Sequence, residues 1–198
     1  GTQTAKLNGT IAGVNVGFYE YLPLGYESNP AKKWPMVIFL HGAGQYGNGS
    51  AAELPKVLSN GPPKNINNGT QYPFICLSPQ INSAWVKSGN YPGAAPYIDG
   101  LLEYAKSFYN VDENRIYMTG LSAGGGMTWS YCIEHPEKIA AIVPVCGSKS
   151  LAAQRSRLAG IPVWALHNWG DSTVPASDAV TMCNALAGYK SKTNPTDM

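Results

Sequence analysis

The chain has 198 residues, which predicts one domain over residues 1–198, because two domains of about 150 residues each would not fit. Its 14 Lys and Arg residues and 12 Asp and Glu residues give a net charge of +2, so the charge balance favours neither a nucleic acid nor an anionic membrane as a partner. No run approaches the ~18 apolar residues of a membrane span, and the amino terminus shows neither a basic segment nor an apolar signal core.

The first 34 residues alternate apolar and polar side chains around a Gly-containing turn, which predicts one or two antiparallel edge strands. Beyond them, continuous apolar runs alternate with helical patterns. Such runs are typical of strands that helices cover on both faces, as in parallel sheets. The predicted buried strands are residues 36–40, 74–79, 115–120, 139–147 and 161–167.

Three helices are expected from apolar spacing and helix-end signals, over residues 98–108, 122–135 and roughly 177–187. Residues 41–70 read as a loop with a short helix in it, and residues 81–96 read as a second loop. Strands and helices that alternate in this way predict a doubly wound α/β fold, with a mostly parallel sheet and helices on both faces.

The sequence Gly-Leu-Ser-Ala-Gly at residues 120–124 fits the pattern G-x-S-x-G, after a predicted strand and before a predicted helix. In that context it resembles the nucleophile elbow of the α/β-hydrolases, with Ser122 as the nucleophile. A strained turn needs small neighbours, and Gly120, Ala123 and Gly124 meet that need. The alternative is a Gly-rich turn with a chance serine.

Asp171 lies 49 residues beyond Ser122, in a loop that follows the predicted strand 161–167. A carboxylate after the penultimate strand is where this fold keeps the acid that orients its histidine. The alternative is an Asp that caps its own loop. His167, four residues before the acid, is expected to pack beneath this loop.

Several motifs occur in one order between residues 36 and 185: LHGAGQYGNG, SNGPPK, SPQ, the elbow with its flanks, and PVWALHNWGDSTVP. Together they resemble the esterase and predicted-peptidase branch of the α/β-hydrolases, which includes family 1 carbohydrate esterases, feruloyl esterases and polyhydroxybutyrate depolymerases. The resemblance implies Ser122 as nucleophile, Asp171 as acid, and no metal or cofactor. Relatives commonly have Gly where Asn168 stands, so we expect this loop to be shaped differently.

The resemblance also implies that residues 41–44, His-Gly-Ala-Gly, form an oxyanion loop. Small residues let backbone N–H groups face a substrate. We assign one donor to Ala43, with Gly44 as the alternative, and the other to Ala123. His41 is then expected to brace its own loop.

In this family the catalytic histidine follows the acid, in a Gly-His motif after one more strand. Here His41, His135 and His167 all precede Asp171, and only 27 residues (198 minus 171) follow it. We therefore expect the chain to be incomplete at its carboxyl end, without the last strand, the final helix and the catalytic histidine. For that reason we expect little or no esterase activity from the 198-residue chain itself.

Gln45, Trp85 and Trp169 fall on loops at the carboxyl ends of strands, where an amide and aromatic faces could contact a sugar or a phenolic acyl group. For the two tryptophans the alternative is packing. The expected function is a serine esterase acting on carbohydrate-linked or phenolic esters, of acetyl or feruloyl type. A peptidase of the same fold, or a binding relative without catalysis, stays open.

Only 13% of the residues are charged, while Gly and Tyr are plentiful, which is typical of exported carbohydrate-acting enzymes. Since the chain opens on Gly1, we expect a mature or trimmed chain from a secreted or periplasmic protein. The cysteines show no CxxC spacing, so buried free thiols are expected, with one disulfide as the alternative. They are Cys76, Cys132, Cys146 and Cys183.

Overall fold

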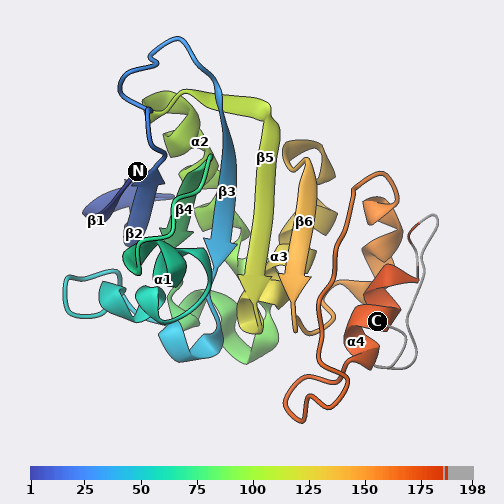
Figure 1. The fold of residues 1–198 in the computed structure, drawn as a ribbon. Coiled ribbons are helices and arrows are strands. Elements are labelled where there is room, and N and C mark those ends of the chain that lie inside the picture. The colour runs from blue at the N-terminus through green and yellow to red at the C-terminus, as the bar shows by residue number, and fades with distance from the viewer. Residues whose placement is uncertain (185, 187–198) are drawn as a thin grey trace.

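In the computed structural model, which describes residues 1–184 and 186, a six-stranded sheet has the order β1-β2-β4-β3-β5-β6 (Figure 1). The pairs β1/β2 and β2/β4 are antiparallel, and the pairs among β4, β3, β5 and β6 are parallel. The strands are β1 Thr2–Ile11, β2 Val14–Leu22, β3 Trp34–Leu40, β4 Ile75–Pro79, β5 Val111–Leu121 and β6 Ala141–Val145. The predicted antiparallel entry and the mostly parallel sheet are both confirmed.

The hairpin between β1 and β2 turns at Ala12 and Gly13, which both have positive φ, 51° and 78°. Two successive residues with positive φ give a turn whose twist matches that of the flanking strands. The Gly-containing turn of the sequence therefore joins two paired strands, as expected.

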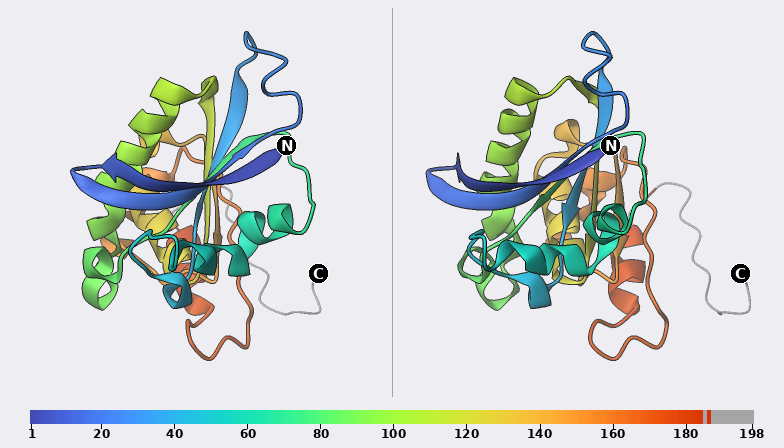
Figure 2. Two further views of the ribbon diagram at one scale, coloured as in Figure 1. Left: turned by 90° about the vertical axis from the view of Figure 1, so that its left-hand side faces the viewer. Right: turned by 60° about the vertical axis from the view of Figure 1, so that its left-hand side comes forward.

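Helices cover both faces of the sheet, as Figure 2 shows with α2 and α3 on one side and α1 on the other. The α-helices are α1 Gly61–Asn67, α2 Ala95–Phe108, α3 Ala123–Glu134 and α4 Ser177–Cys183. Short 3-10 helices occur in the connecting loops: η1 Ala43–Gln45, η2 Leu54–Ser59, η3 Ser83–Gly89, η4 Tyr91–Ala94, η5 Pro136–Lys138 and η6 Ala152–Leu158. The helix predicted over 177–187 ends at Cys183, and its expected end at residue 187 lies outside the described residues.

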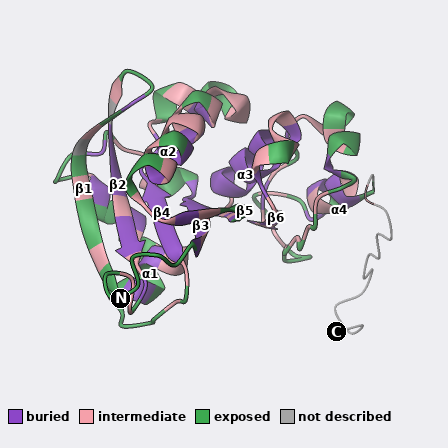
Figure 3. Ribbon diagram, turned by 90° about the horizontal axis from the view of Figure 1, so that it is seen from above, coloured by how far each residue is buried: buried purple, intermediate pink, exposed green. Residues whose placement is uncertain are grey.

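Side chains of β3 alternate between two cores. Ile38 and Leu40 pack in the larger cluster, under α2 and α3, whereas Phe39 packs with Ile66 of α1 on the other face. Residues 123–133 of α3 are all buried, and Figure 3 shows this helix as a largely purple element beside the sheet. The helix that follows Ser122 is thus held on every side, so the turn before it is rigid.

Residues 161–167, predicted as a strand, run beside β6 but form only two isolated parallel bridges, Ile142 with Val163 and Val145 with Leu166. The Trp164 and Leu166 N–H groups donate to Ile142 and Pro144 carbonyl oxygens at 3.0 Å. This extended segment carries the chain to the loop that holds Asp171. No helix of the described residues is long and apolar enough to cross a bilayer.

Candidate active site

Ser122 lies at the sharp turn between β5 and α3, with φ 57° and ψ −116°. Its N–H donates to the Val145 carbonyl oxygen at 2.9 Å, and its carbonyl oxygen accepts from the Gly126 N–H at 3.0 Å. A non-glycine residue with such a positive φ costs of order 1–3 kcal/mol, so the surrounding structure must hold it there. The expected strained turn is present.

The glycines beside Ser122 are required by close backbone approaches. A Cβ on Gly120 would lie 2.2 Å from the Gly124 carbonyl oxygen, and a Cβ on Gly124 would lie 1.9 Å from the Leu40 carbonyl oxygen. Neither backbone oxygen can move aside as a flexible side chain would. The two glycines therefore allow α3 to begin directly against β3 and β5.

Two N–H groups are available near Ser122. Ala123 is the first residue of α3 and Ala43 is the first residue of η1, and N–H groups at the start of a helix have no partner within it. The η1 loop passes beside the serine, since a Cβ on Gly42 would lie 3.6 Å from the Ser122 Cβ atom. The structure thus brings Ala43, Ala123 and Ser122 to one place, at the carboxyl ends of β3 and β5.

Both ring nitrogens of His41 are used inside the protein. Nε2 accepts from the Ile81 N–H at 2.8 Å, which leaves Nδ1 to donate to the Gly42 carbonyl oxygen at 2.8 Å. The residue is fully buried. Burial lowers the pKa of the His41 imidazole to about 4, and the Gly42 carbonyl opposes that shift. His41 braces its loop, as expected.

A pocket of about 610 Å³ opens beside the serine. Its lining includes both alanines that carry the candidate N–H donors, together with two tyrosines and one cationic side chain. The lining residues are Ala43, Tyr46, Ser83, Ala84, Val86, Lys87, Ser88, Gly89, Tyr91 and Ala123. Sequence analysis missed Tyr46 and Tyr91, because aromatic residues in loops carry no pattern that separates pocket walls from packing.

The three predicted substrate contacts are placed differently. The Gln45 side chain lies over Gly42, where a Cβ would be 3.3 Å from its Oε1 atom. Trp85 stacks on Tyr97, with ring centroids 3.5 Å apart and planes 11° apart, and is outside the pocket lining. Trp169 is 43% exposed, in the loop just before Asp171. Packing thus accounts for the Trp85 ring, and substrate contact by any of the three stays a prediction.

Asp171 lies in a tight loop after the extended segment 161–167. Its Oδ1 atom accepts from the Thr173 and Val174 N–H groups, both at 2.9 Å. The bond from Val174, with that from Thr173 and the nearby His167, lowers the pKa of the Asp171 carboxyl. The carboxylate is therefore ionised at neutral pH and its Oδ2 atom is not used by these bonds.

His167 packs beneath the Asp171 loop, as expected. Its Nε2 atom donates to the Val174 carbonyl oxygen at 2.8 Å and lies 3.6 Å from Asp171 Oδ2. The side chain is 5% exposed, and the Nδ1 atom is buried without a hydrogen-bond partner. The ring is thus held to its own loop through the Nε2 atom.

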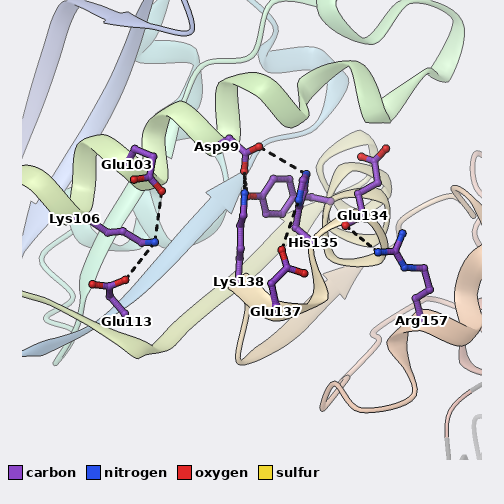
Figure 4. A network of polar contacts seen from close by, with 10 residues as sticks. Asp99, Glu103, Lys106, Glu113, Glu134, His135, Glu137, Lys138 and Arg157 are labelled. Carbon is purple, nitrogen blue, oxygen red and sulfur yellow. Dashed lines mark hydrogen bonds and ion pairs between the residues drawn. The ribbon is translucent and has the colours of Figure 1, made fainter.

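His135 lies at the end of α3 opposite Ser122. Its ring is 3.7 Å from the Asp99 carboxylate, which also binds Lys138 at 2.6 Å (Figure 4). In the described part of the chain, no hydrogen bond joins a histidine to the Ser122 hydroxyl. The structure therefore brings together Ser122, Ala43 and Ala123, without a histidine base among residues 1–184 and 186.

Cys146 was not singled out as a site residue. It follows β6 with φ 40°, next to the Val145 carbonyl that accepts from the Ser122 N–H. Burial raises the pKa of this thiol, and the polar backbone of Ser122 opposes the shift. Cys76, Cys132 and Cys183 are buried, and all four thiols are free.

Comparisons with known proteins bear on the family and the fold of this chain. A family model described as phospholipase/carboxylesterase matches residues 26–197. The chain is 27% identical over 192 residues to a poly(3-hydroxybutyrate) depolymerase of Ralstonia pickettii, a match that covers 90% of this chain and 36% of that protein. It is 30% identical over 142 residues to acetylxylan esterase A of Emericella nidulans, with 67% of this chain and 42% of that protein covered.

Among solved structures, a thermostable esterase superposes with a TM-score of 0.72 at 29% identity, over 92% of this chain and 51% of that one. The α/β-hydrolase fold is therefore confirmed. The chain spans about half of that esterase and well under half of the two curated relatives.

Proposed function

Since the chain belongs to the phospholipase/carboxylesterase family, we propose that it carries the nucleophile and oxyanion site of a serine carboxylic-ester hydrolase. One observation carries this proposal. Ser122 lies at a strained strand-to-helix turn, and Ala43 and Ala123, whose N–H groups stand at helix starts, line the pocket beside it. An acyl-transfer enzyme needs a nucleophile and oxyanion donors in that relation.

The proposed reaction has two steps. The Ser122 hydroxyl attacks the ester carbonyl carbon and loses its proton, the bond to the alcohol oxygen breaks, and the alcohol leaves with a proton. Water then attacks the acyl-enzyme, which releases the carboxylic acid and returns the proton to Ser122. In both steps the Ala43 and Ala123 N–H groups would stabilise the negative charge on the former carbonyl oxygen.

Both steps need a base, and the histidines of the described residues are not hydrogen-bonded to Ser122. His41 uses both nitrogens inside its loop, His135 lies at the far end of α3, and His167 is tied to Val174. We propose that a histidine outside these 198 residues acts as the base and that Asp171 orients it. The Oδ2 atom of Asp171 accepts neither of the two loop hydrogen bonds and is suited to accept from such a ring.

The pocket supports small or planar acyl groups on a polar alcohol. Tyr46 and Tyr91 offer aromatic faces, and a volume of about 610 Å³ exceeds what an acetyl group needs. We propose carbohydrate-linked or phenolic esters, of acetyl or feruloyl type, as the substrates. The names of two relatives, an acetylxylan esterase and a probable feruloyl esterase, support this class. We also propose that the protein is secreted or periplasmic, on the low share of charged residues.

The test compares p-nitrophenyl acetate with a peptide p-nitroanilide, using a longer natural protein that contains this chain. We expect hydrolysis of the ester and an acyl adduct on Ser122 after rapid acid quench and peptide mass spectrometry. Faster cleavage of the anilide would favour a peptidase. Sugar binding without any adduct would favour a binding relative and would contradict the proposal.

A further inference from the structure

The side chain of Gln80, which follows β4, is 1% exposed and uses its whole amide on backbone groups of one loop. Its Nε2 atom donates to the Gln45 and Glu53 carbonyl oxygens, at 2.9 and 2.8 Å. Its Oε1 atom accepts from the Gly49 N–H at 2.9 Å. One buried side chain thus joins three points of the segment 45–53, which lies 27 to 35 residues earlier in the chain.

The loop is shaped around this amide. A Cβ on Gly47 would lie 2.4 Å from the Gln80 Nε2 atom, so the Gly47 backbone contacts the amide directly. The Gly47 N–H donates to the Ile81 carbonyl oxygen at 3.2 Å, and the Ile81 N–H donates to His41. Residues 80 and 81 therefore hold both ends of the loop that carries η1.

We propose that Gln80 is a positioning residue that sets the direction of the Ala43 N–H in the oxyanion site. This inference rests on the proposed function. Ala43 and Gln45 are the first and last residues of the single turn η1, and the Gln45 N–H donates to the Gly42 carbonyl oxygen at 3.1 Å. The Tyr46 N–H donates to the Ala43 carbonyl oxygen at 3.3 Å, and His41 Nδ1 donates to the Gly42 carbonyl oxygen at 2.8 Å. The Ala43 peptide is thus linked to the Gln45 peptide through the hydrogen bonds of this one turn, so fixing the Gln45 carbonyl restrains the orientation of the Ala43 N–H.

The chemistry of the position requires an amide. Both Nε2 protons face carbonyl oxygens, so a carboxylate of the same shape would place an acceptor against two acceptors in a buried site. The substitution Gln80→Glu therefore replaces the donor NH2 group by an acceptor oxygen without changing the size of the side chain. The Gln80→Met variant keeps the length and removes the polar atoms.

The experiment uses a longer protein that shows Ser122-dependent ester hydrolysis. An oxyanion donor acts mainly in the transition state, and losing one costs ~10²–10³ in kcat. We expect Gln80→Glu and Gln80→Met to lower kcat about 10- to 100-fold and to change KM less than about twofold. For Gln80→Glu, kcat relative to the parent enzyme should partly recover on acidification, because the protonated carboxyl regains one donor.

Gln3→Glu is the matched control, because the Gln3 amide also donates to a backbone carbonyl, that of Pro63 at 3.1 Å, but at a distance in the chain from the η1 loop. It should leave kcat unchanged. In Gln80→Met we also expect faster hydrogen exchange of the backbone amides, confined to residues 42–53. This measurement does not depend on activity.

Unchanged kcat in both folded Gln80 variants would overturn the inference. So would a failure of both variants to fold, since the amide would then serve the whole fold rather than this loop. If the parent protein shows no Ser122-dependent hydrolysis, the proposed function fails first and this inference falls with it.

Discussion

The Ile81 backbone N–H donates a hydrogen bond to the Nε2 atom of His41, 2.8 Å away, and so requires the neutral imidazole. His41 has a pKa of about 4 in the fold against 6.5 ordinarily. The unfolded chain therefore binds more protons between pH 6.5 and 4, and stability must fall as the pH falls through that window.

We expect His41 to contribute a loss of up to about 3 kcal/mol of unfolding free energy on acidification from pH 7 to 4. Urea unfolding at several pH values measures it. The variant His41→Gln should be less stable at pH 7 but should lose this part of the slope. Carboxylates with lowered pKa, such as Asp171, act in the same direction at lower pH and remain in both proteins. An equal slope in the variant would contradict the role given to His41.

Gly124→Ala should destabilise the protein by at least about 3 kcal/mol, because its Cβ would lie 1.9 Å from the Leu40 carbonyl oxygen. Gly160→Ala is the control, since a Cβ there meets nothing within 4 Å, and it should change stability by about 0.5 kcal/mol or less. Thermal unfolding of both variants decides the matter. Similar stabilities would show that α3 does not begin against β3 as described.

Ser122→Gly should be more stable than Ser122→Ala by about 1 kcal/mol, because glycine adopts φ 57° without strain. The order should reverse at Ser107, an exposed position in the last turn of α2, where glycine costs up to about 1 kcal/mol relative to alanine. Chemical denaturation of the four variants tests both signs. The same order at the two positions would rule out a strained turn at Ser122.

Asp171→Asn should keep its loop, because an amide oxygen can still accept from Thr173 and Val174. If Asp171 orients a catalytic histidine, kcat should fall by up to ~10⁴. Asp112→Asn is a matched control, since its Oδ1 atom accepts in the same way from Asn114 at 3.0 Å. Steady-state kinetics on p-nitrophenyl acetate measure both, and full activity in Asp171→Asn would exclude it as the acid.

Local sequence was enough to predict the turn at Ser122. The close approach of Gly120 to the Gly124 carbonyl oxygen arises within five positions of the chain, although Gly124 itself also meets the Leu40 carbonyl oxygen of a distant strand. Apolar runs likewise predicted most strands, because a strand that is buried on both faces has apolar side chains at consecutive positions rather than at every second one. The α/β order and the placement of the site at the carboxyl ends of β3 and β5 follow from these short-range signals.

Contacts between distant segments could not be predicted. Gln80 and Gln45 are 35 residues apart, and His41 and Ile81 are 40 residues apart. The local sequence around each of these residues contains no pattern that predicts its hydrogen-bond partner. Trp85 shows the same limit, because only the fold reveals that Tyr97 covers its ring. The segment expected as a strand over 161–167 forms only two bridges with β6. Apolar composition alone does not predict how many backbone hydrogen bonds such a segment forms with its neighbouring strand.

The central claim is that Ser122 is the nucleophile of an ester hydrolase whose base lies outside these 198 residues. The most direct test is kcat/KM for p-nitrophenyl acetate, measured for the 198-residue chain, for a longer natural protein that contains it, and for Ser122→Ala in the longer protein. We expect little turnover by the 198-residue chain, turnover by the longer protein, and a loss of up to ~10⁶-fold in Ser122→Ala. Robust activity of the 198-residue chain, or turnover retained in Ser122→Ala, would contradict this account.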